Sequence, residues 1–134
     1  MANAAIYKEL GGFLADKSGH AILIYDFAND AGAQGTIDLG EAKQKMCIKN
    51  AYIHVQTACT SAGSATVSIG STDDADGILD TTSGAVANLT ADAVLFETTD
   101  KLFLDVGDKI SLVIGTADLT AGKIAVHLDL DILA

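Results

Sequence analysis

Residues 122–133 read GKIAVHLDLDIL, and this stretch decides the fold class. Apolar side chains occupy every second position, with lysine, alanine, histidine and aspartate between them. Successive side chains of a β-strand point to opposite faces, so a period of two predicts a strand with one buried face and one face in solvent. The predicted buried face holds Ile124, Val126, Leu128, Leu130 and Ile132.

The same alternation recurs along the chain and predicts further strands of this kind. It occupies residues 51–59 (within a longer strand-like run, 47–59), 64–70, 101–106 and 109–115. Residues 20–27 and 36–39 are also expected to be strands. Turns that contain glycine separate the runs, as at residues 61–64 and 106–109. Seven to eight short strands at this spacing predict an all-β antiparallel β-sandwich or barrel rather than βαβ units.

The inward positions of these runs form the predicted core. In the run 101–106 the alternation also turns Val106 inward. The remaining core positions are Ile53, Val55, Val67, Ile69, Leu102, Leu104, Ile110, Leu112, Ile114, Val126, Leu128 and Leu130.

The run 20–27 differs from the others because both of its faces are apolar. We expect both faces to be covered, either by a partner subunit or by the chain's own N-terminal segment at a central place in the sheet. Residues 1–19 are predicted to form an N-terminal arm or a short helix, and residues 20–134 the β-sandwich domain. Within the arm, residues 3–10 have helical spacing, and Gly11 and Gly12 would end that helix.

The charge balance excludes several classes of function. The chain has 134 residues and a formal net charge of −10, and all of its basic residues other than histidine are lysines. Such a surface is repelled by phosphate backbones, so nucleic-acid binding is not expected. No apolar run is long enough to cross a membrane, and residues 1–19 do not read as a secretory signal.

The two cysteines, Cys47 and Cys59, lie at the two ends of one predicted strand. At about 3.3 Å per residue they would be about 40 Å apart, whereas a disulfide needs Cα atoms within about 7 Å. We expect two reduced thiols that pack as small apolar side chains. A protein with free thiols is typical of synthesis in a reducing cytoplasm.

The search for catalytic chemistry finds no constellation. The phosphate-binding loop, the G-x-S-x-G nucleophile elbow and the common zinc-ligand spacings are all missing from the sequence. The three histidines, His20, His54 and His127, are far apart in sequence, and His54 and His127 are interpreted as ordinary residues of solvent-facing strand positions. No enzyme activity and no catalytic residue are predicted.

The acidic segment of residues 71–77 is the best candidate for a ligand site. Asp73, Asp74 and Asp76, followed by Gly77, are weak candidates for binding calcium, because a hard cation needs several oxygen ligands. The segment matches the EF-hand loop poorly, and a solvated turn with Asx capping explains it more simply. Apart from this possible calcium ion, no cofactor is expected.

The order of four segments resembles a known family. A strand with polar alternation (residues 52–57) is followed by ATVSIG (65–70), by DADGIL (74–79) and by LTAGKIAV (119–126). This layout is similar to that of tailed-bacteriophage head-decoration (cement) proteins of jelly-roll type. The resemblance implies a β-sandwich, often a homotrimer, that binds the lattice of the major capsid protein and stabilises the phage head. It also implies a place on the capsid surface of the virion after synthesis in the host bacterial cytoplasm.

Two other functions stay open at the level of sequence. The chain could be a phage tail, fibre or adaptor component. It could also be a calcium- or carbohydrate-binding β-sandwich, although sugar binding usually needs aromatic platforms and the chain has only three tyrosines and four phenylalanines.

Overall fold

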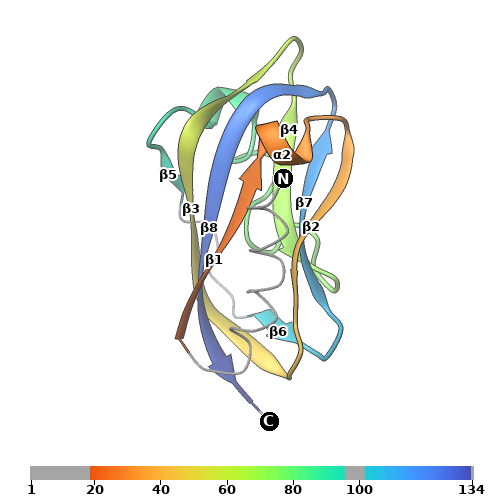
Figure 1. The fold of residues 1–134 in the computed structure, drawn as a ribbon, viewed down its shortest axis with the longest axis vertical. Coiled ribbons are helices and arrows are strands. Elements are labelled where there is room, and N and C mark those ends of the chain that lie inside the picture. The colour runs from red at the N-terminus through yellow and green to blue at the C-terminus, as the bar shows by residue number, and fades with distance from the viewer. Residues whose placement is uncertain (1–18, 96–101, 134) are drawn as a thin grey trace.

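The computed structural model describes residues 19–95 and 102–133 (Figure 1). The predicted N-terminal arm and its short helix lie outside the described residues, so the division into arm and domain stays a prediction. The elements in chain order are β1 (Gly19–Asp26), α2 (Phe27–Asp30), β2 (Gly35–Glu41), β3 (Met46–Ser61), β4 (Thr66–Ser71), the 3-10 turn η1 (Val86–Asn88), β5 (Val94–Leu95), β6 (Leu102–Leu104), β7 (Lys109–Gly115) and β8 (Leu119–Ile132).

These strands form two antiparallel sheets that pack face to face. One sheet has the order β1-β8-β3-β5, with β6 also paired to β3, and the other has the order β2-β7-β4. The long strands β3 and β8 run side by side along the length of the molecule (Figure 1). The predicted all-β antiparallel sandwich is confirmed.

The strand pairs are nested, as in a single long hairpin that has been rolled up. Strand β1 pairs with β8, β2 with β7 and β3 with β6, and β4 is bridged at Ile69 to Leu79, while β5 pairs with β3 outside this nesting. This nesting is the jelly-roll topology. Representative partners, from the outermost pair to the innermost, are Gly19 with Leu130, Gly35 with Ile114, Met46 with Leu104, and Ile69 with Leu79.

The core lies between the two sheets and contains all twelve of the core positions predicted from the alternation. Among the other inward assignments Val106 is wrong, because 62% of its surface is exposed, and Ile132 is only partly buried. Strand β6 ends at Leu104, and a turn closed by the hydrogen bond from the Asp108 amide to the Asp105 carbonyl follows it. Gly107 takes a positive φ of 92° in this turn, as its place in the predicted turn requires.

Strand β1 does not occupy the central position that we considered for it. It lies at the edge of its sheet and pairs only with β8 among the described strands. The expectation that both faces are covered is correct at Ile24, which is 7% exposed, and wrong at Ile22, which is 37% exposed. The outward side of β1 is therefore open at Ile22.

Strand β8 begins earlier than the alternation indicated. Strand β8 starts at Leu119, three residues before the alternating stretch 122–133. Gly122 lies within the strand at φ +144°, where the register between β3 and β8 shifts. A Cβ atom at this position would lie 2.5 Å from the Sγ atom of Cys59. The glycine is thus required by both backbone conformation and close packing.

Neither cysteine forms a disulfide bond within the chain, as expected. Cys59 is buried, and its burial raises the pKa of the thiol to about 11. The thiol is therefore protonated at neutral pH and packs as an apolar group.

We predict that Gly122→Ala lowers the free energy of unfolding by about 2 kcal/mol or more, because it adds backbone strain and a clash with Cys59. Gly107→Ala is the matched control: it has a positive φ but nothing within 4 Å of the new Cβ atom, so it adds only the strain. Urea denaturation of both variants, and of Gly122→Ala combined with Cys59→Ala, measures the difference. Equal losses for the two single variants would contradict this account of Gly122.

Candidate functional site

The outward side of the β1-β8-β3 sheet brings together residues that are far apart in sequence. In the strand register, Ile22 lies opposite His127, and His127 lies opposite Tyr52 on the next strand. One row away, His20 lies opposite Asp129. Side chains at directly opposed positions of antiparallel strands share a face, so these residues form one continuous surface cluster.

The polar groups of this cluster are linked by short hydrogen bonds. The Nδ1 atom of His20 lies 3.0 Å from Oδ1 of Asp129, and its Nε2 atom lies 3.0 Å from Nδ1 of His127. The ring of His127 stacks on the ring of Tyr52, with the centroids 4.4 Å apart and the planes 6° from parallel. The carboxylate, the two imidazoles and the phenol ring therefore hold one another in place.

This geometry limits the number of protons that the histidine pair holds. In the His20–His127 hydrogen bond one ring nitrogen donates and the other accepts. If both rings were protonated, two N–H groups would face each other and the bond would break. The pKa of His127 is lowered from its ordinary value by partial burial, then by the charge of His20 and then by that of His54. The cluster thus favours a neutral His127.

The surroundings of the cluster combine apolar side chains with paired charges. Ile22, Val94 and Phe103 are among the exposed large apolar residues, and they share this side of the sheet with the cluster. Ion pairs lie at the rim, Lys49 with Asp131 at 3.4 Å and His54 with Asp92 at 3.3 Å. We call the outward surface formed by the following residues the histidine face: His20, Ile22, Tyr52, His54, Val94, Phe103 and His127.

The alternation predicts solvent-facing strand positions for His54 and His127 but does not indicate that they lie near His20. The missing information is the strand order, because His20 and His127 are 107 residues apart and meet only through the pairing of the first strand with the last. The sequence does contain one signal for the cluster, namely histidines at outward positions of two alternating runs. That signal indicates a histidine cluster only when the two runs are known to be neighbouring strands.

The three aspartates of the predicted cation site lie in a tight turn after β4. Asp73, Asp74 and Asp76 are exposed, and the Ser71 amide donates to the Asp74 carbonyl in a tight turn. A hydrogen bond with Asp74 is the main reason that the pKa of Asp76 is raised. No three histidine, cysteine, aspartate or glutamate side chains converge as metal ligands among residues 19–95 and 102–133. Calcium binding by these three aspartates stays a prediction.

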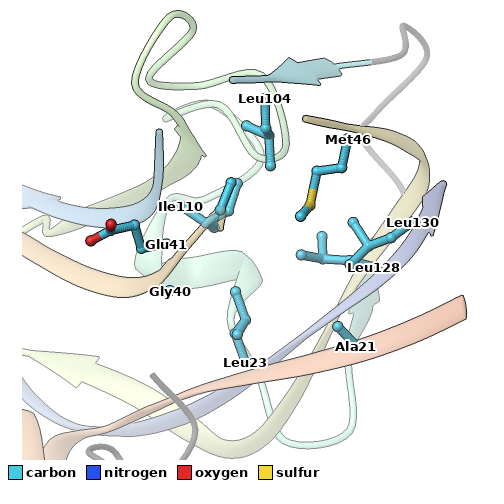
Figure 2. A pocket seen from close by; sticks show the side chains of 10 residues that line it. Ala21, Leu23, Gly40, Glu41, Met46, Leu104, Ile110, Leu128 and Leu130 are labelled. Atoms are coloured by element: carbon cyan, nitrogen blue, oxygen red, sulfur yellow. The ribbon is translucent and has the colours of Figure 1, made fainter. Parts of the chain in front are cut away.

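A small apolar cavity lies inside one end of the sandwich (Figure 2). Its volume is about 20 Å³, and its lining includes Leu23, Met46, Leu104 and Leu128. The carboxylate of Glu41 points away from these side chains and pairs with Lys43 at 3.2 Å. Sites for small molecules usually measure about 300–1,000 Å³, so this cavity is a packing defect. The described helices include none that is long and apolar enough to cross a membrane.

Comparisons with known proteins find similarity in structure alone. No family model matches the chain, and no curated protein matches it. The chain is similar to one in the acidic stable capsid structure of Helicobacter pylori bacteriophage KHP30, with 13% identity, a TM-score of 0.59 and coverage of 87% of this chain and 88% of that chain. It is also similar to a chain of the cyanophage Pam1 capsid asymmetric unit, with 11% identity, a TM-score of 0.62 and coverage of 87% of both chains.

These similarities establish a shared fold. Because the alignments cover nearly the same share of both chains, the capsid chains are close to this one in length. The fold implied by the resemblance to jelly-roll phage proteins is therefore confirmed.

We predict that the pKa of His127, measured by NMR titration, lies below the ordinary histidine value of about 6.5. A folded-state pKa below the unfolded value means that stability is lost as the pH falls below about 6.5. His20→Asn removes one source of repulsion, so the pKa of His127 should rise while remaining below its ordinary value. His54→Asn is the control and should raise it less. An unshifted pKa in the wild type would refute the cluster geometry.

We predict that replacing Asp73, Asp74 and Asp76 together with Asn changes the free energy of unfolding by no more than about 0.5 kcal/mol, because the three side chains are exposed. Thermal unfolding with and without millimolar calcium tests both this expectation and the cation site. A calcium-dependent rise in Tm for the wild type alone would establish that the aspartates bind the ion.

Proposed function

We propose that this chain is a non-enzymatic structural protein of a phage virion, a capsid decoration protein that binds the lattice of the major capsid protein and stabilises the head. The observation that carries the proposal is the jelly-roll fold shared, over nearly the whole length of each chain, with chains of two phage capsid structures. The similar lengths of the chains matter, because they mean that the shared fold is the whole sandwich rather than one part of it.

The surface of the described residues fits binding better than catalysis. The cavity at the end of the sandwich, at about 20 Å³, is too small for a small-molecule substrate. By contrast, the histidine face combines exposed aliphatic and aromatic side chains with charges at its rim. An apolar centre with a polar rim is the usual anatomy of a protein–protein interface.

In this proposal the protein works as a symmetric homotrimer. The chain has no arginine, so a bidentate Arg–carboxylate pair on its own side cannot anchor a contact. Binding must come from many modest contacts made by apolar side chains, backbone groups, lysines and aspartates. Several linked copies that bind a repeating lattice gain affinity without any strong single site.

The proposal is tested on heads of the phage that encodes the chain, prepared without this protein. Adding the purified chain should yield heads that co-sediment with it in fixed stoichiometry. A protein that binds only the assembled head should also raise the temperature at which the heads break open. An unrelated acidic β-sandwich of similar mass serves as the control. Failure to co-sediment, with no change in that temperature, would reject the decoration role.

A further inference from the structure

We propose that His20 and His127 are the two protein ligands of a site for a divalent transition-metal ion of the zinc, copper and nickel class, and that the bound ion ties strand β1 to strand β8. The site is separate from the acidic turn after β4, which carries the calcium prediction. It is also independent of the proposed role in the virion, because it needs neither an oligomer nor a capsid.

Asp129 sets the chemical form of the first ligand. Its carboxylate accepts a hydrogen bond of 3.0 Å from Nδ1 of His20, so that nitrogen carries the proton of the neutral ring. The other nitrogen, Nε2, therefore holds a free lone pair, and it is the atom that lies next to His127. Histidines that bind metals usually donate their second N–H to a carboxylate in this way. His20 is thus already in the tautomer that a metal ion requires.

The distance between the two ring nitrogens suits one shared ion. Nε2 of His20 and Nδ1 of His127 lie 3.0 Å apart. With metal–nitrogen bonds of about 2.1 Å, two neighbouring ligand atoms lie about 3.0 Å apart in an octahedral shell and about 3.4 Å apart in a tetrahedral one. An ion can therefore replace the hydrogen bond after a small tilt of the rings. The proton that His127 carries on Nδ1 moves to its Nε2, so both rings stay neutral.

The second ligand is held in place before any ion binds. The ring of His127 stacks on Tyr52, with the centroids 4.4 Å apart and the planes 6° from parallel. Both histidines project from paired strands of one sheet rather than from a loop. Partial burial and the charges of His20 and His54 lower the pKa of His127, which favours the neutral ring that binds metals. Little conformational entropy is then lost on binding, and this favours affinity.

The ligand atoms decide which ions fit the site. Imidazole nitrogen suits zinc, copper and nickel, whereas calcium and magnesium take oxygen ligands. The side chains of His20 and Asp129 are 42% and 48% exposed, so an ion can enter from solvent. No third histidine, cysteine, aspartate or glutamate joins the pair among residues 19–95 and 102–133. Water must therefore complete the shell, and binding should lie in the micromolar range. The net charge of −10 attracts cations to the surface.

The bound ion links two segments that are far apart in the chain. Strand β1 lies at the edge of its sheet and pairs only with β8 among the described strands. His20 and His127 are 107 residues apart, and a link that closes a long loop removes much entropy from the unfolded chain. An ion that binds only the folded state also shifts the folding equilibrium toward that state. Metal binding should therefore stabilise the fold and hold β1 on β8.

Isothermal titration calorimetry with zinc chloride at pH 7.5, on the purified full chain, tests the site. The wild type should bind one zinc ion per chain, and calcium chloride should not displace it. Asp129→Asn should weaken binding about tenfold or more, the usual effect of removing the carboxylate behind a metal-bound histidine. His20→Asn and His127→Asn each remove a ligand, so each should raise the dissociation constant further than Asp129→Asn does.

Three variants serve as matched controls. His54→Asn removes a histidine of the same face that is bonded to Asp92 rather than to a second imidazole. Cys47→Ser removes the partly exposed thiol. The third variant has Asn in place of all three aspartates of the acidic turn after β4. Circular dichroism verifies that each variant retains the strand signal, and all three should bind zinc as the wild type does.

The effect on the strands is measured on the same protein. Zinc should shift the NMR ring signals of His20 and His127 more than those of His54, and it should raise Tm. It should also slow hydrogen exchange of the β1 amides more than that of the amides of β2, the edge strand of the other sheet.

The unfavourable outcomes are equally specific. No saturable zinc binding by the wild type, or zinc bound by His20→Asn as tightly as by the wild type, overturns the site. A loss of binding in any of the three controls equal to that in His20→Asn places the ion elsewhere and overturns it too. Binding without a rise in Tm and without slower exchange in β1 overturns the link between the strands. None of these results bears on co-sedimentation with heads, which decides the decoration role separately.

Discussion

The pairing of β8 with β1 on one side and β3 on the other is the constraint on which the rest of the structure depends. Because side chains of a strand alternate between faces, the register of β8 decides what lies in the core and what lies in solvent. In the observed register Leu128 and Leu130 point into the sandwich, and His127 and Asp129 point outward. A slip by one residue would bury the imidazole and the carboxylate and expose both leucines.

The side chains that stabilise the fold and those of the candidate site therefore lie on opposite faces of the same strands. The inner sides of β1, β8 and β3 are packed against the second sheet and are nearly inaccessible to solvent. Because burial on that side fixes the register, the outer side can carry polar groups that contribute little to folding. The cluster of His20, His127 and Tyr52 is positioned by rigid strands rather than by loops, which favours a precise geometry.

The sequence was sufficient for the parts of the fold that depend on local alternation. Strand β7, most of β8 and the core positions follow from the period of two, because burial acts on every second residue. Strand ends were less predictable: β6 stops at Leu104 because a turn takes over at Asp105, although the apolar period continues to Val106. The histidine cluster was beyond local reasoning, since it requires knowing that the first and last strands are neighbours. The requirement for glycine at position 122 was equally beyond local reasoning, because it depends on Cys59 of another strand.

The central proposal is that this sandwich is a capsid decoration protein. A cryo-electron microscopy reconstruction of heads that carry the protein tests it most directly, because it shows both the place of the chain and the face that it buries. The proposal predicts density for the sandwich on the outer surface of the head, as three copies around a local three-fold axis. Heads without density for the chain on their outer surface would contradict it.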